Sequence, residues 1–215
     1  GGNWEGKNIL CNNINISTVA FNFGLKEDKV REIISSCSQK LLNVRSKRVS
    51  PGLDDKILTS WNSLMITAFA KGFRVTGDER YLNAAKNCIS FLEKNLFVGG
   101  KLLRTHKNGS AKINGYLEDY SYFTNALLDV FEIHPDSKYL KLAQQLGHHM
   151  VDHFWDEENN SFFMTSDSHE SLIIRPKSNY DLSLPSGNSV SCFALLRLFH
   201  LSQEQKFLEI SIKIM

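Results

Sequence analysis

The chain has 215 residues, of which 42% are hydrophobic and 22% charged, with a formal net charge of +2 at pH 7. This composition is that of an ordinary globular protein, and the interspersed acids and bases exclude the basic stripe that a nucleic-acid partner requires. No apolar run approaches the roughly 20 residues needed to cross a bilayer, so we expect no membrane partner.

The four cysteines, Cys11, Cys37, Cys88 and Cys192, lie far apart and form neither a zinc pattern nor a disulfide framework. We therefore expect reduced thiols, no metal, no cofactor and a cytoplasmic location. The chain does not begin with Met, and its last apolar-periodic segment carries no helix stop signal. These two features predict a fragment of a longer protein.

The first part of the chain is predicted to contain one helix. Residues 1–25 are rich in Gly and Asn and are interpreted as an extended arm. Apolar residues at helical spacing predict a helix over 27–46, with acids in its first turn and bases in its last. The segment 45–52, which contains Pro51, is predicted to be a connecting loop.

The rest of the chain is predicted to form three helical hairpins. Their helices are expected over 57–75 and 78–95, over 118–133 and 136–154, and over 187–201 and from 203 onward. The second helix of each pair opens with an aromatic residue followed by Leu, at Tyr81, Tyr139 and Phe207. A repeat of roughly 60–70 residues predicts stacked hairpins, which build either solenoids or closed toroids.

The links between the hairpins favour the toroid. Residues 100–115 are expected to form a β-hairpin around Asn108-Gly109, because this dipeptide favours a tight turn. A second pair of strands is expected from 161–164 and 172–174. Long, strand-like loops at one end of the hairpins are typical of a toroid that carries a pocket beneath them.

Polar clusters stand at the three inner-helix starts. They are Asp54, Asp55, Lys56, Trp61 and Asn62; Glu118, Asp119 and Tyr120; and Arg175, Asp181, Ser183, Ser186 and Asn188. Helix capping could account for each cluster alone, since Asp119 and Ser186 are favoured N-cap types. Because every cluster adds a further acid, an aromatic residue or an arginine, we favour one shared pocket.

Such a pocket suits a neutral, sugar-like ligand, because sugars stack on aromatic rings and bond to carboxylates and amides. The candidate catalytic acids are Asp54, Asp55, Glu118, Asp119 and Asp181. The candidate substrate-binding residues are Lys56, Trp61, Asn62, Tyr120, Arg175, Ser186 and Asn188. Lys56 and Arg175 could instead hold the acids ionised. His149 and His153 have metal-ligand spacing, but we interpret them as part of a helix face.

Four motifs occur in the same order in one known family: Glu5–Leu10, Asp54–Asn62, Leu117–Tyr120 and Pro185–Asn188. Arg175 and Asp181 also stand where that family has an arginine and an aspartate. On these motifs the chain is identified as a member of the YyaL / spermatogenesis-associated protein 20 family.

The resemblance implies an all-α fold. It would be a partial (α/α)6 toroid of helical hairpins, similar to six-hairpin glycosidases and N-acylglucosamine 2-epimerases, with small β-hairpins in the loops at the pocket end. Residues 1–215 would form a single domain, a piece of a larger toroid. The thioredoxin-like domain that the family carries upstream is absent from this sequence. Either self-association or the missing part of the toroid would complete the ring.

Two functions follow as hypotheses. The first is a carbohydrate-active domain that binds or processes a sugar or glycoside by acid/base chemistry, in the manner of a glycoside hydrolase or a sugar epimerase. The epimerases depend on catalytic histidines, and no histidine stands at an inner-helix start here. The alternative is a non-catalytic toroid that binds a ligand or a protein for the upstream redox domain.

Overall fold

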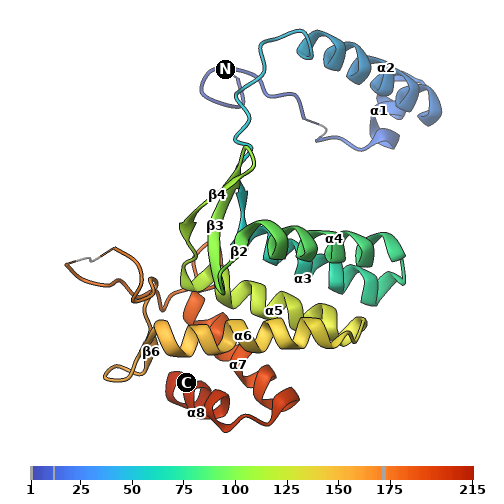
Figure 1. Cartoon of the computed structure of the whole chain (residues 1–215). Helices are drawn as coiled ribbons and strands as arrows, with labels where there is room; N and C mark the ends of the chain where they lie inside the picture. Colours follow the sequence, from blue (N-terminus) through green and yellow to red (C-terminus); the bar gives the residue numbers. More distant parts are fainter. Residues whose placement is uncertain (1, 12, 171–172) are drawn as a thin grey trace. The chain divides into compact units, whose positions relative to one another are not determined.

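The computed structural model describes residues 2–11, 13–170 and 173–215 (Figure 1). Contacts divide the chain into two compact units, Gly1–Asp54 and Asp55–Met215. A single domain over 1–215 was expected from the sequence. The two units separate because residues 46–54 form neither helix nor strand and expose all their side chains, so no core runs through them.

The first unit contains α1 (Ile16–Phe23) and α2 (Glu27–Arg45). The predicted helix over 27–46 is confirmed, whereas the extended arm over 1–25 is wrong for residues 16–23. The side chain of Asn15 accepts a hydrogen bond from the backbone N–H of Thr18 at the start of α1, and Gly24 ends the helix with φ 61°. These two caps enclose a helix of eight residues, which is too short for apolar spacing to reveal.

The second unit holds the three predicted hairpins. Their helices are α3 (Thr59–Thr76), α4 (Glu79–Leu96), α5 (Leu117–Ile133), α6 (Ser137–His153), α7 (Gly187–Ser202) and α8 (Gln205–Ile214). Each predicted boundary lies within two residues of the observed one. The side chains of Asp78, Asp136 and Ser186 cap the starts of α4, α6 and α7.

The helices form an inner row and an outer row. The inner helices α3, α5 and α7 pack side by side, and α4, α6 and α8 each pack on the inner helix of their own hairpin (Figure 1). The central helix α5 contacts helices of both rows and is therefore the most deeply buried. Phe123, Leu127 and Val130 of α5 are fully buried in the core.

A small antiparallel sheet stands beside the inner-helix starts. It consists of β1 (Ile57–Leu58), β2 (Phe97–Val98), β3 (Lys101–Lys107) and β4 (Ser110–Asn114), and β3 pairs with each of the other three. The β3–β4 hairpin is confirmed at the predicted turn, where Asn108 and Gly109 have φ of 50° and 74°. Strand β1 occupies residues 57–58, so α3 begins at Thr59 rather than at 57.

The second predicted strand pair has a different partner. Strand β6 (Ser161–Phe162) pairs with β5 (Trp155–Asp156) and not with residues 173–174. The indole of Trp155 packs edge-on against Phe162, with 5.1 Å between ring centroids, which favours this tight local pairing. Ile173 and Ile174 are exposed and form no strand, and Leu172 lies outside the described residues.

Candidate functional site

The starts of the three inner helices meet at one end of the second unit. At the start of α3, the backbone N–H of Ser60 donates to Oδ1 of Asp119 on α5, at 2.9 Å. From α5, the hydroxyl of Tyr122 donates to the carbonyl of Pro185, which lies two residues before α7. These contacts join residues about 60 positions apart and confirm that the helix starts converge.

Asp119 is the most enclosed of the candidate acids. Its side chain is fully buried and accepts hydrogen bonds from the backbone N–H of Ser60 and Tyr116, both at 2.9 Å. Nη1 of Arg104 makes a third contact at 3.1 Å. Burial raises the pKa of Asp119 to about 6, although the charge of Arg104 acts in the opposite direction. Asp119 is therefore part of the internal framework of the site.

Glu118 lies beside Asp119 but remains accessible. The same Nη1 atom of Arg104 donates to Oε1 of Glu118 at 2.7 Å. The Glu118 side chain is 27% exposed, and its Oε2 has no partner among the described residues. The guanidinium group of Arg104 also lies over the ring of Tyr116, with 4.5 Å between the guanidinium carbon and the ring centroid.

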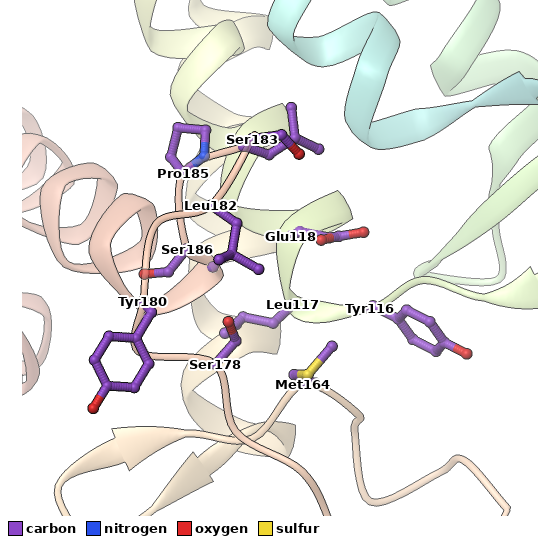
Figure 2. A pocket seen from close by; sticks show the side chains of 12 residues that line it. Tyr116, Leu117, Glu118, Met164, Ser178, Tyr180, Leu182, Ser183, Pro185 and Ser186 are labelled. Carbon is purple, nitrogen blue, oxygen red and sulfur yellow. The ribbon is translucent and has the colours of Figure 1, made fainter.

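Glu118 opens onto a pocket of about 250 Å³. The pocket is lined by Tyr116, Leu117, Glu118, Met164, Ser178, Tyr180, Leu182, Ser183, Leu184, Pro185, Ser186 and Gly187. Figure 2 shows Leu182, Ser183 and Pro185 on the loop before α7, facing the first turn of α5 with Leu117 and Glu118. Glu118 is the one charged residue among those that line the pocket. The walls thus combine apolar surface, serine hydroxyls and a single carboxylate.

The cluster at residues 54–62 does not line this pocket. Asp55 forms an ion pair with Lys107 near the β3–β4 turn, at 2.5 Å. Trp61 is 60% exposed, and Asn62 donates back to the carbonyl of Leu58 at 2.8 Å. The pairing of β1 with β3 explains the shift, because it places the residues before Ile57 along the hairpin. This corrects the expectation of one pocket shared by all three clusters.

Two further members of this cluster also lie elsewhere. Lys56 lines a separate cavity of about 320 Å³ with Lys107 and Lys112 on the hairpin. Asp54 is the last residue of the first unit and is exposed.

Tyr120 and Asn188 are buried and do not line this pocket, although Asn188 lines a different cavity of about 590 Å³. Tyr120 is 2% exposed; its hydroxyl accepts from the N–H of Leu102 at 2.8 Å, and its ring stacks on His149 at 4.7 Å. The amide of Asn188 accepts from the N–H of Phe162 at 2.7 Å and donates to its carbonyl at 3.0 Å. Both polar groups, which were predicted to bind substrate, are used in hydrogen bonds within the protein.

Arg175 and Asp181 act on the loops around the pocket. Arg175 donates to the carbonyls of Thr165 and His153 and lies 4.0 Å from the ring centroid of Phe163. Asp181 accepts from the N–H of Ser186 at 2.7 Å. The two residues therefore shape the chain before α7, but neither is among those that line the pocket.

Ser186 and Ser183 do reach the pocket. The hydroxyl of Ser186 caps α7 by accepting from the N–H of Ser189 at 3.1 Å, and both Ser183 and Ser186 are lining residues.

The sequence did not point to Arg104 or Tyr116. Arg104 occupies an alternating β-strand, where an arginine is an ordinary solvent-facing residue, and Tyr116 stands two residues before the helix predicted over 118–133. The position of Glu118-Asp119 after a hairpin rich in basic residues is the signal that could have indicated a counter-charge.

The paired histidines are part of a helix face, as predicted. Burial, with a smaller effect of His153, lowers the pKa of His149 to about 4. Nδ1 of His153 contacts the carboxylate of Asp167 at 3.0 Å. Within the described part of the chain, no group of three or more His, Cys, Asp or Glu side chains could hold a metal ion. Nor is any described helix long and apolar enough to span a membrane.

Known proteins resemble this chain in sequence over most of its length. No protein-family model matches it. Spermatogenesis-associated protein 20 of Homo sapiens is 34% identical over 208 residues, which cover 92% of this chain and 26% of the relative. The Rattus norvegicus protein of the same name is 31% identical over 219 residues, with 97% of this chain and 28% of the relative covered.

The chain belongs to the spermatogenesis-associated protein 20 family. It spans about a quarter of the length of these curated relatives.

Solved structures with the same fold are sugar enzymes. D-mannose isomerase matches 74% of this chain and 39% of its own, with a TM-score of 0.62 and 17% identity. Cellobiose 2-epimerase from Bacillus thermoamylovorans matches 75% of this chain and 44% of its own, with a TM-score of 0.64 and 13% identity. These likenesses confirm the predicted fold, a partial (α/α)6 toroid of helical hairpins with small β-hairpins.

A third neighbour covers more of the chain. It is a variant of α-1,6-mannanase from a Salegentibacter species, solved with α-1,6-mannotetrose, which matches 93% of this chain and 56% of its own. Its TM-score is 0.60 and its identity 15%.

Proposed function

We propose that this family member is the sugar-binding part of a carbohydrate-active toroid, with the pocket beside Glu118 as its ligand site. One observation carries the proposal. At the end where the inner helices converge, Glu118 lines a pocket of about 250 Å³; Arg104 holds one of its carboxylate oxygens, and the other has no partner among the described residues. The fold shared with sugar isomerases, epimerases and mannanases supports this choice of ligand class.

The pocket walls suit a pyranose ring. The carboxylate of Glu118 can accept hydrogen bonds from sugar hydroxyls, and the hydroxyls of Ser178 and Ser183 can donate or accept. Leu117 and Leu182 offer apolar surface to the C–H face of a sugar ring. A mostly apolar cleft with a few polar groups is the usual form of a small-molecule site.

The reaction would use Glu118 as its acid/base group. The α-1,6-mannanase neighbour is described as inactive when two adjacent aspartates are replaced. This chain has adjacent acids at Asp54-Asp55 and at Glu118-Asp119, and of these Glu118 lines the pocket. We assign the chemistry to Glu118, and to Asp119 the support of the helix starts, because its oxygens already accept from three donors.

The test uses the intact protein and three probes, D-mannose, cellobiose and α-1,6-mannotriose. Saturation-transfer NMR measures binding, and chromatography of the mixture detects isomerised or hydrolysed product. We expect binding of at least one probe, weakened about tenfold or more in Glu118→Gln, because a hydrogen bond to a charged group contributes about 1.5–3 kcal/mol. Glu93→Gln, at an exposed position of α4, is the matched control and should bind as the wild type does.

The outcomes separate the two functional hypotheses. Binding with product supports an enzyme, and binding without product supports the non-catalytic module. No binding of any probe by the wild type, or equal binding by Glu118→Gln, contradicts the proposed site.

A further inference from the structure

We infer that Arg104, on the β3–β4 hairpin, is the positioning residue of this pocket, and that it holds Glu118 as a carboxylate facing the ligand. The inference rests on the proposed function. It assigns to the hairpin a part of the site that the inner-helix motifs do not contain.

One atom of Arg104 connects two adjacent acids. Nη1 lies 2.7 Å from Oε1 of Glu118 and 3.1 Å from Oδ2 of Asp119. The arginine side chain is 23% exposed, so the ion pairs are largely shielded from water. Two backbone donors fix Asp119 in place. Asp119 in turn holds Arg104, and Arg104 holds Glu118. Of the two acids, the accessible one is thereby oriented by the buried one.

The backbone is anchored at the two residues that precede Arg104. The N–H of Leu102 donates to the buried hydroxyl of Tyr120 on α5, at 2.8 Å. The carbonyl of Leu103 accepts from the hydroxyl of Thr59 at the start of α3, at 2.6 Å. Two inner helices therefore fix the backbone of β3 from which the Arg104 side chain reaches the two acids.

The return strand brings a second support. A Cβ atom added at Gly115 would lie 2.8 Å from the carbonyl oxygen of Leu102, so the chain passes β3 at backbone contact before it enters α5. This close approach places the ring of Tyr116 under the guanidinium group of Arg104, at 4.5 Å. A planar cation over an aromatic face is a geometry that arginine satisfies and lysine satisfies less well.

The chemical consequence concerns the role of Glu118. A carboxylate that is ion-paired with a guanidinium group is a hydrogen-bond acceptor. Glu118 would therefore accept hydrogen bonds from sugar hydroxyls at its second oxygen. Without Arg104 the side chain would keep its chemistry but lose its fixed direction. Preorganisation of this kind lowers the cost of binding without adding a contact to the ligand.

The experiment compares Arg104→Ala, Arg104→Lys and Arg80→Ala in the intact protein with the probe that the wild type binds best. Arg80 also pairs with an aspartate, Asp78, but its side chain is 88% exposed on α4, which makes it a matched control. Arg104→Ala is expected to lose probe affinity about tenfold or more, and Arg104→Lys to recover part of that loss. Arg80→Ala should bind as the wild type does.

Chemical rescue separates positioning from mere folding. Ethylguanidinium at millimolar concentration should restore part of the probe affinity of Arg104→Ala, and ethylammonium should restore less. Wild-type affinity in Arg104→Ala overturns the inference and leaves the proposed function intact. A loss that neither Lys nor ethylguanidinium reverses, accompanied by a fall in Tm, shows a structural role and also overturns it. If the wild type binds none of the three probes, the proposed function fails and the inference with it.

Discussion

Two pairs of adjacent acids stand at inner-helix starts, and the structure treats them differently. Asp54-Asp55 precedes α3, and Glu118-Asp119 opens α5. Asp55 is 49% exposed and pairs with a lysine that is itself 45% exposed. Asp119 is fully buried and shares an arginine with Glu118.

The difference comes from what packs over each pair. Helix α5 lies between α3 and α7, and the start of β3 packs on its first turn, so Asp119 is fully buried and Glu118 is largely shielded from water. In the first pair, Asp55 precedes β1 and lies half exposed beside Lys107 of the hairpin. Two pairs of adjacent carboxylates thus acquire different chemistry, because burial strengthens electrostatic interactions and hydrogen bonds.

Removing the buried acid should have the largest effect on stability. Asp119→Ala leaves the N–H groups of Ser60 and Tyr116 without their acceptor and removes one of the two acids that balance Arg104. We expect a loss of about 3 kcal/mol in the free energy of unfolding, measured by urea titration at pH 7.

Asp119→Asn sharpens this prediction. The amide keeps one acceptor oxygen but loses the charge. The free energy of unfolding of Asp119→Asn should therefore lie between that of the wild type and that of Asp119→Ala. An Asp119→Ala protein as stable as the wild type would show that the network contributes nothing and that the two acid pairs do not differ in the way described.

The helices of the second unit could be predicted because their signals are local. Apolar spacing, caps such as Asp78 and Asp136, and the Asn108-Gly109 turn all lie within a few residues of the element that they define. The partner of β6 could not be predicted, because two apolar segments competed for it and the choice depended on how Trp155 packs. The short helix α1 was missed because its eight residues make only about two turns, too few for apolar spacing to be recognised.

The candidate site was predictable in part. The sequence identified Glu118 and Ser186, which line the pocket, because their clusters hold more acids, aromatic residues and arginines than helix capping requires. It could not distinguish them from Tyr120 and Asn188, whose polar groups are used inside the protein. The sequence did not indicate Arg104, because its partners lie on another element and only the tertiary fold brings them together.

The stability of the protein should depend on pH through a half-buried group that packs on α5, His149. His149 stacks on Tyr120 and has a pKa of about 4, lowered chiefly by burial. A base whose pKa is lowered on folding contributes stability at a pH above its pKa in the unfolded state, about 6.5. That contribution is lost as the pH falls toward 4. Between pH 7 and pH 5 we expect the wild type to lose about 1 kcal/mol more than His149→Phe, since the half-buried ring keeps part of its hydration.

The aromatic replacement keeps the stack on Tyr120 and removes the titrating group. Asp119 titrates in the same range with the opposite sign, because its raised pKa makes stability fall as the pH rises through about 6. This second effect is present in both proteins and cancels in the difference between them. Equal pH dependence of the urea midpoints in wild type and His149→Phe would contradict the prediction.

The smallest effect is expected at the exposed pair. Asp55→Ala removes an ion pair with Lys107 in which both side chains are about half exposed, and such pairs contribute little because water and salt screen them. The Tm should stay unchanged at physiological salt, and the binding of a sugar probe should also be unaffected, since Asp55 does not line the pocket. If Asp55→Ala instead abolished probe binding while Glu118→Gln did not, the two acid pairs would have exchanged roles. The ligand site would then lie along the hairpin, beside Lys107, rather than beside α5.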